Sequence, residues 1–359
     1  MITLTATPAA DGFAMPAERD PHDGCVLAWP ENGYVWREGA RPAQRAVAAL
    51  ANAIAETGEH VTVTVGDEQY PHARSLLSGR IRVVEAASWL AWARDVAPVF
   101  VVDGLGRRRG VDFTFTGYRQ RYPYWQLDDR YAGKVLDLTD TPRYRSPLVA
   151  EGGAVHVDGE GTCLVTAEAM TDRNAGLVRD EIDAALRDYL GVRTVVWIEQ
   201  GLVDDPTAHV DNVACFVRPG VVCLAWTDDT ADPQYERCAA TLDRLRGAID
   251  ARGRRLRVEK LPSPRPRYPS DDELRGVDST PVSWPVSTRL AASYCNFYLA
   301  NGHVLAPLLD PERDDEALAT LCRLFPDRTV VGLDTRELLL GGGNIHCATQ
   351  QVPAVTAAG

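Results

Sequence analysis

The stretch Val213-Ala214-Cys215-Phe216-Val217-Arg218-Pro219-Gly220-Val221-Val222-Cys223-Leu224-Ala225-Trp226 holds two apolar runs that are separated by a Pro-Gly pair. Valine and aromatic side chains favour strands, and proline followed by glycine between two such runs favours a tight turn. The stretch therefore predicts a β-hairpin. What fold it belongs to depends on how often this unit recurs along the chain.

The hairpin recurs at three other places, where apolar runs flank Asp-Gly or Asn-Gly, the strongest short hairpin signals. These places are residues 99–104, 154–166 and 296–305. Apolar residues spaced by three and four predict helices over residues 41–57, 179–189, 234–251 and 316–325. Further β-rich runs predict strands near residues 61–65, 193–198, 256–261 and 330–333. Repetition of hairpin, helix and strand predicts an α/β protein whose similar modules form a ring or solenoid.

The charge of the chain bears on its partners. Among 359 residues there are 50 acidic and 38 basic side chains, which give a net charge of -12. This charge disfavours nucleic acid and anionic membranes as partners, because both are negatively charged. A small cationic substrate suits it better.

The eight cysteines show no CxxC pair and no zinc-ligand spacing, so we expect reduced thiols. The first 13 residues lack the basic start and apolar run of a secretory signal. No segment is apolar over the length that a bilayer requires. We therefore expect a cytoplasmic protein.

A second distinctive stretch, Gly341-Gly342-Gly343-Asn344-Ile345-His346-Cys347-Ala348-Thr349-Gln350-Gln351, lies near the C-terminus. Consecutive glycines are typical of a backbone that takes positive φ or lets another group approach closely. A thiol that follows such a turn is a candidate nucleophile, although free cysteine is also among the most buried residue types. The local sequence leaves both interpretations of Cys347 open.

Polar residues stand before strands or hairpins at three further places: Arg94-Asp95, Glu151-Gly152-Gly153 and His209-Val210-Asp211. In the third, a spacing of two predicts that both polar side chains share one face of a strand. Each place alone fits a solvated pair or a turn residue. Together with Cys347 they offer a thiol nucleophile, an acid–base histidine and three carboxylates. Carboxylates repel anions but accept paired hydrogen bonds from a planar guanidinium, so the set predicts attack on a guanidinium carbon.

Several longer motifs resemble the agmatine deiminase family. They are residues 15–30, 151–162, 209–220, 289–302 and 341–351, and the similarity extends from about Met15 to Pro353. The resemblance implies a five-bladed α/β propeller of pseudo-repeated ββαβ modules, in agreement with the recurring hairpins. A single catalytic domain would then cover residues 1–359, with short flexible termini at about 1–14 and 354–359.

The resemblance also implies roles for individual residues. Cys347 matches the family's nucleophile, His209 its general acid and base, and Glu151 the acid that bonds the substrate and orients the histidine. Asp95 and Asp211 would hold the guanidinium nitrogens. Other residues expected at the substrate are Trp92 and Asp205 at its alkyl-amine end, with Arg119, Gly342 and Asn344. No metal or organic cofactor is implied. Agmatine would become N-carbamoylputrescine, which belongs to polyamine biosynthesis and arginine metabolism.

Other segments depart from the family's usual sequence. Residues 94–98 read RDVAP where the family has RDTGP or a close variant, and residues 89–91, 117–121 and 204–208 also differ. Because these segments border the expected pocket, the substrate could be arginine or an arginine-derived biosynthetic intermediate instead of agmatine. Arg119 or Arg121 would then bind its carboxylate.

Three other activities are compatible with parts of the sequence. An amidinotransferase of the same fold would pass the amidino group to an amine instead of water. A metallohydrolase could use His156-Val157-Asp158 with His209-Val210-Asp211, although the Asp-rich strand ends of binuclear manganese enzymes are absent from the sequence. A guanidinium-binding protein without turnover would not need Cys347, His209 and Glu151. A homodimer is left open.

Overall fold

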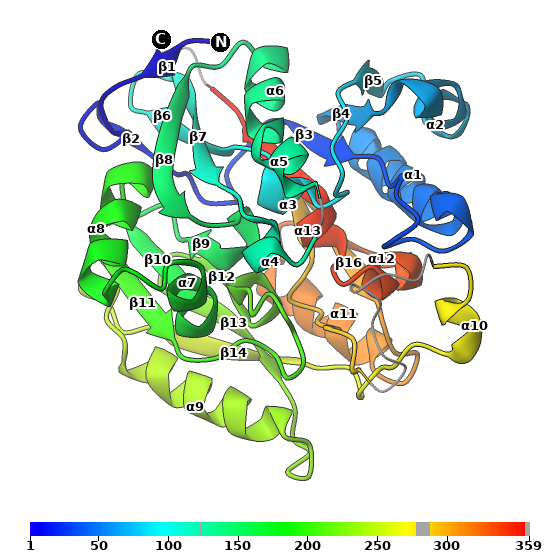
Figure 1. Ribbon diagram of the computed structural model, residues 1–359. Helices are drawn as coiled ribbons and strands as arrows, with labels where there is room; N and C mark the ends of the chain where they lie inside the picture. The colour runs from blue at the N-terminus through cyan, green and yellow to red at the C-terminus, as the bar shows by residue number, and fades with distance from the viewer. Residues whose placement is uncertain (123, 278–287, 356–359) are drawn as a thin grey trace.

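The computed structural model describes residues 1–122, 124–277 and 288–355 (Figure 1). Within these residues the strands form five separate sheets, and helices lie between successive strands along the chain. The predicted mixed α/β class is confirmed.

Three of the sheets have three strands each. Their strands are β9 (Val155–Val157), β10 (Thr162–Thr166) and β11 (Thr194–Ile198); β12 (Ala214–Arg218), β13 (Val221–Trp226) and β14 (Arg257–Pro262); and β15 (Tyr298–Ala300), β16 (His303–Leu308) and β17 (Thr329–Asp334). In each sheet an antiparallel hairpin is followed by a helix and then by a third strand that pairs in parallel. The hairpins predicted at Asp158-Gly159, Pro219-Gly220 and Asn301-Gly302 are confirmed.

The two larger sheets contain the same three-stranded unit. One has the order β1 (Thr3–Leu4), β8 (Arg143–Val149), β7 (Arg108–Thr114), β6 (Val99–Asp103), β2 (Phe13–Ala14). The other has the order β18 (Thr349–Pro353), β3 (His22–Ala28), β4 (His60–Val65), β5 (Arg82–Glu85). In the latter the antiparallel pair joins the two ends of the chain, since β18 lies beside β3 (Figure 1). No hairpin turn marks this pair in the sequence, because more than three hundred residues separate its strands.

The helices have the following bounds. The longer ones are α1 (Arg41–Glu56), α2 (Tyr70–Leu76), α6 (Tyr131–Leu138), α7 (Ala167–Arg173), α8 (Arg179–Leu190), α9 (Gln234–Gly247) and α11 (Asp314–Leu324). The short ones are α3 (Ala93–Val96), α4 (Gly117–Gln120), α5 (Trp125–Asp129), α10 (Asp271–Leu274), α12 (Arg336–Leu340) and α13 (Ile345–Ala348), with 3-10 turns η1 (Glu38–Ala40), η2 (Asp67–Gln69), η3 (Gly152–Ala154) and η4 (Val210–Asn212).

Helix α1 shows why the predicted helices form. Pro42 stands in its first turn, where a missing N–H costs nothing. Val47, Leu50 and Ile54 follow at spacings of three and four and are all buried. Their apolar face packs on β3 and β4 and closes the core of that sheet.

Three expectations differ from the structure. Residues 1–14, expected as a flexible terminus, contain β1 and β2, which pair with β8 and β6. The helix predicted over residues 234–251 ends at Gly247, because the chain turns back there and Ile249 bridges to Arg255. Residues 209–211 do not form a strand, since His209 precedes the 3-10 turn η4.

Every helix in the described part of the chain is too short or too polar to cross a membrane.

Gly191, which follows α8, is tightly packed, and this packing predicts how its substitution changes stability. Gly191 and Gly58 both follow helices with positive φ, 66° and 91°. A Cβ at Gly191 would lie 2.6 Å from the carbonyl oxygen of Phe13, whereas nothing lies within 4 Å of one at Gly58. We expect Gly191→Ala to lower the free energy of unfolding by about 1–3 kcal/mol more than Gly58→Ala, because it adds overpacking to the same left-handed strain. Urea unfolding of both variants measures this difference, and equal losses would contradict it.

Candidate active site

Cys347 lies in the one-turn helix α13, close to α3 near the middle of the molecule (Figure 1). The glycines before it have the properties that the sequence predicts. Gly342 has a φ of 96°, and a Cβ on Gly343 would lie 2.9 Å from both the Cys347 Cβ and the Trp92 ring. Side chains at these positions would push the thiol away from Trp92, so the glycines set where the sulfur lies.

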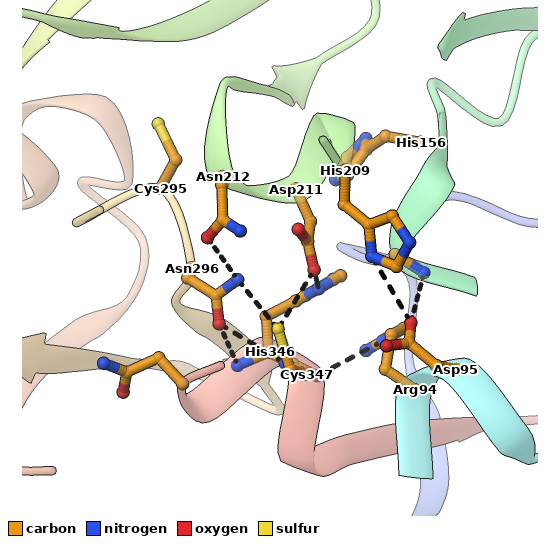
Figure 2. Close-up of polar contacts among 12 residues, drawn as sticks. Arg94, Asp95, His156, His209, Asp211, Asn212, Cys295, Asn296, His346 and Cys347 are labelled. Carbon is orange, nitrogen blue, oxygen red and sulfur yellow. Dashed lines mark hydrogen bonds and ion pairs between the residues drawn. The ribbon is translucent and has the colours of Figure 1, made fainter. Parts of the chain in front are cut away.

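Two side chains from other sheets face the Cys347 sulfur (Figure 2). Asp211 Oδ2 lies 3.5 Å from Sγ, and the amide Nδ2 of Asn296 lies 3.2 Å from it. Asn296 also accepts, through Oδ1, hydrogen bonds from the backbone N–H groups of His346 (3.0 Å) and Cys347 (3.3 Å). The amide therefore fixes the first turn of α13 and contacts the sulfur at the same time.

The protonation of the Cys347 thiol depends on the carboxylates beside it. Burial raises the pKa of the Cys347 thiol well above its usual value, and the negative charges of Asp211 and Asp95 raise it further. Before a cation enters, the sulfur is thus held as a thiol. A bound cation would oppose both effects.

His209 lies between two carboxylates. Its Nε2 is 3.2 Å from Glu151 Oε2, and its Nδ1 is 3.7 Å from Asp95 Oδ1. Burial by itself would lower the pKa of His209, but Asp95, Glu151 and Asp211 outweigh that effect and raise it to about 9. His209 is therefore protonated at neutral pH and can donate a proton.

Arg173 and His209 keep Glu151 in its charged form, and they contact different oxygens of its carboxylate. Burial would raise the pKa of Glu151, but Arg173, whose Nε is 3.1 Å from Oε1, and His209 lower it below its usual value. Arg173 also donates to the backbone carbonyl of Thr207, two residues before the histidine. Glu151 and Arg173 together fix the orientation of His209.

Asp95 comes from α3, and burial raises its pKa. Tyr118 donates a hydrogen bond of 2.6 Å to Oδ2, and the backbone N–H of Gly153 donates one of 3.1 Å to Oδ1. A Cβ on Gly153 would lie within 3.0 Å of His209, Asp211 and Asp95. This glycine, beside Glu151 in the sequence, therefore lets the three functional side chains approach one another.

Asp211 has one oxygen engaged and one available. Oδ2 accepts from His346 Nδ1 at 2.9 Å, whereas the buried Oδ1 has no hydrogen-bond partner in the described part of the chain. Burial would raise the pKa of Asp211, but His346 and His209 lower it. Asp211 Oδ1 is therefore available to accept a hydrogen bond from a ligand that enters beside Cys347.

Beneath Asp211 the charges continue into a buried network. His346 Nε2 lies 2.9 Å from Glu18 Oε1, and Arg94 donates to the same carboxylate at 3.2 Å (Figure 2 shows Arg94 below the site). Burial opposes the charge of Glu18, but His346, Arg94 and His156 lower its pKa well below the usual value. The network holds His346, and through it Asp211, in a fixed position.

A cavity of about 430 Å³, partly open to solvent, reaches these groups. Its lining residues are Trp92, Asp95, Tyr118, Arg121, Tyr122, Pro206, Thr207, His209, Asn212, Gly341, Gly342, Gly343 and Cys347. Of the residues predicted at the substrate, Trp92 and Gly342 line the cavity, and Asp95, His209 and Cys347 do so among the catalytic candidates. Glu151 and Asp211 lie behind this lining, in contact with His209 and Cys347.

Three predicted substrate residues do not line the cavity. Arg119 is an exposed side chain paired with Asp172, since α4 turns it outward, and Arg121 of the same loop reaches the lining instead. Asp205 is buried and accepts from Thr207 and Asn212, so it shapes the loop before His209. Asn344 caps α13 by accepting from the Ile345 N–H.

The sequence interpretation missed four residues of the site. Asn296, His346 and Glu18 lie inside the motifs that carry the resemblance, but their residue types alone did not distinguish a functional role from packing. Tyr118 lies in the divergent loop, at a backbone φ of 50° that local sequence does not predict. A pattern of polar residues inside otherwise apolar motifs was the available signal.

A metal centre is not indicated at the cavity. In the described residues, its histidine, cysteine and carboxylates do not form a group of three ligand atoms within 4.8 Å of one another.

The chain is similar to known proteins over nearly its whole length. The model of the Porphyromonas-type peptidyl-arginine deiminase family matches residues 14–353. The agmatine deiminase of Ectopseudomonas mendocina is 49% identical over 365 residues, which cover 99% of each chain, and that of Pseudomonas aeruginosa (strain LESB58) is 50% identical over the same share. The solved structure of an agmatine deiminase from Enterococcus faecalis has a TM-score of 0.94 and 36% identity, covering 99% of this chain and 100% of that one.

The raised pKa of His209 predicts a pH-dependent stability. A histidine whose pKa rises from 6.5 to about 9 on folding contributes stability that is fully present below pH 6.5 and is lost as the pH rises through 9. We expect the free energy of unfolding of the unaltered protein to fall over this window more steeply than that of His209→Gln, which cannot titrate. Urea unfolding at pH values across the window measures both slopes. Parallel slopes would show that His209 is not protonated in the folded protein.

Proposed function

The chain belongs to the Porphyromonas-type peptidyl-arginine deiminase family, and from that membership we propose that it hydrolyses agmatine to N-carbamoylputrescine and ammonia. The observation that carries the proposal is the arrangement around Cys347. Its sulfur lies 3.5 Å from Asp211 Oδ2, the other oxygen of that buried carboxylate has no hydrogen-bond partner in the described residues, and a protonated histidine lies at the same cavity.

Substrate binding follows from the two carboxylates. A guanidinium is planar and carries its donors in a fixed fork, so Asp211 Oδ1 and Asp95 can each accept from a different nitrogen. Tyr118 now donates to Asp95, and a guanidinium donor would share or replace that hydrogen bond. The ring of Trp92 lines the cavity beside Cys347 and suits the alkyl chain of the substrate.

The bound cation would activate the thiol. Two carboxylates keep the thiol protonated in the free protein, and a guanidinium between them offsets their charge. The thiol then loses its proton to solvent, and the thiolate forms a bond to the guanidinium carbon. The π electrons of that carbon move onto a nitrogen, which gives a neutral tetrahedral adduct held by Asp95 and Asp211.

His209 would complete both half-reactions. Its proton passes to the departing nitrogen, the C–N bond breaks, ammonia leaves, and a covalent thiouronium remains on Cys347. The neutral histidine then takes a proton from water as the water oxygen attacks the same carbon. Collapse of this second adduct breaks the C–S bond, the hydroxyl proton passes to solvent, and the neutral ureido product and the thiolate are released. Glu151 and Arg173 keep the ring in place throughout.

The same proposal extends to the architecture. We take the five sheets as the blades of a five-bladed propeller in one catalytic domain. Support comes from the three-stranded unit that all five share and from β18, which supplies the last blade with its first strand. A functional residue precedes a strand of each of the five sheets: Asp95 before β6, Glu151 before β9, His209 before β12, Asn296 before β15 and Cys347 before β18.

Purified protein assayed with agmatine and with arginine tests this function. We expect ammonia and a ureido product from agmatine in preference to arginine, insensitivity to a chelator and inactivation by a thiol reagent. Cys347→Ser should lower kcat by on the order of 10³-fold or more, because the covalent route is lost. Cys163→Ser, a buried cysteine in another sheet, serves as the matched control and should retain activity.

Two results would overturn the proposal. Turnover of arginine but not agmatine would move the substrate to a carboxylate-bearing guanidine, and Arg121 lines the cavity where such a carboxylate would bind. Equal activity of Cys347→Ser and the control would remove the thiol from the reaction.

A further inference from the structure

Three cysteines outside the cavity lie together. Cys215 and Cys223 are directly opposite each other on the antiparallel pair β12–β13, and Cys295 precedes β15. Their sulfur atoms all lie within 4.8 Å of one another, and the three residues are at most 3% exposed. This cysteine cluster is separate from Cys347 and has no part in the reaction described above.

We propose that Cys215, Cys223 and Cys295 form a binding site for a soft, thiophilic metal ion, with Cu(I) as the ion that suits it best. Soft thiolate sulfur selects Cu(I) and related ions over hard cations such as Mg²⁺ or Ca²⁺. Three sulfurs placed about 2.3 Å from a central ion in one plane are about 4 Å apart. The cluster therefore needs shifts of less than about an ångström to close around an ion.

The number and kind of ligands favour Cu(I) over zinc. Structural zinc sites are almost always four-coordinate. In the described residues the group contains three sulfurs, and no histidine or carboxylate joins them within the same distance. A three-coordinate ion that accepts sulfur alone fits this set.

The cluster lies in an apolar environment. Val217, Ala225 and Leu261 belong to the same buried apolar cluster as the three cysteines. Metal ions bind cysteine as the thiolate, so each sulfur that coordinates the ion releases its proton to solvent.

The alternative is that three thiols simply pack as small apolar side chains, which buried cysteines often do. The two explanations differ in what the protein binds. Packing requires no affinity for a metal, and a site requires one ion per chain held by these sulfurs.

The position of Cys295 connects the cluster to the active site. The next residue, Asn296, donates to Cys347 Sγ and accepts from the N–H groups of His346 and Cys347. In Figure 2 Cys295 points away from Cys347, while Asn296 turns toward it. Movement of the Cys295 sulfur onto an ion would pull on the segment that holds the nucleophile, so an occupied site should lower turnover.

The binding test uses the full chain with Cys347→Ala and Cys322→Ser, which removes the catalytic thiol and the exposed one. The protein is titrated anaerobically with Cu(I) against a chromophoric Cu(I) chelator. We expect one ion per chain, with three sulfurs in its X-ray absorption spectrum. Adding Cys295→Ser should weaken binding at least tenfold, whereas adding Cys163→Ser, equally buried in β10, should not. Absence of binding, or equal binding by both variants, would overturn the proposal.

A second measurement covers the case in which Cys295→Ser does not fold. The chain with the cluster intact is loaded with one equivalent of Cu(I), unfolded in the presence of an alkylating reagent and mapped by mass spectrometry. Cys215, Cys223 and Cys295 should be protected relative to Cys25 and Cys163. Equal labelling of all five would contradict the site.

The effect on turnover rests on the proposed function and is tested separately. With Cys347 present, one equivalent of Cu(I) should lower kcat for agmatine in the unaltered protein but much less in Cys295→Ser. Equal inhibition of both would show that the ion acts at Cys347. Because binding is measured without any substrate, failure of the agmatine reaction and failure of the metal site are distinguishable.

Discussion

The interior of this protein holds carboxylates that only nearby cations keep charged. Glu151 is balanced by Arg173 and His209, and Glu18 by His346 and Arg94. Beside the cavity the balance is incomplete, because Asp211 Oδ1 has no donor in the described residues and the Cys347 thiol is kept protonated. In the proposed reaction, a cation of the right shape would complete the arrangement and allow the thiol to ionise. Recognition of the substrate and activation of the thiol would then be one electrostatic event.

The charged side chains of the site come from several sheets. The functional side chains precede strands of all five sheets, with His209 and Asp211 both before β12, so the strands behind them hold the groups in position. Gly153 and Gly343 have no side chain, and a Cβ at either position would collide with groups of the site. The pairing of β18 with β3 joins the C-terminal and N-terminal parts of the chain directly after Cys347.

The sequence allowed prediction of what local patterns determine. Asp-Gly and Asn-Gly turns located three hairpins, and alternating apolar spacing located α1 and α8. Local patterns do not predict which distant strands pair. The pairing of β18 with β3 is an example, because more than three hundred residues separate the two strands. His209 was placed on a strand because its spacing from Asp211 is two, yet η4 gives the same pair a different geometry. The positive charge of Arg119 predicts that it binds a carboxylate of the substrate. Its side chain instead pairs with Asp172 at the surface, because its direction depends on the backbone angles of α4, which charge alone does not reveal. His346 and Glu18 matter through contacts with residues far away in the chain.

The central claim is that Cys347 attacks a guanidinium carbon and carries it as a covalent intermediate. Rapid acid quenching of the protein during turnover of agmatine, followed by peptide mapping, tests it most directly. The account predicts an adduct on Cys347 alone, with the mass of agmatine less ammonia, which disappears when the substrate is exhausted. Steady turnover with no adduct at any time, or an adduct on a different residue, would contradict it.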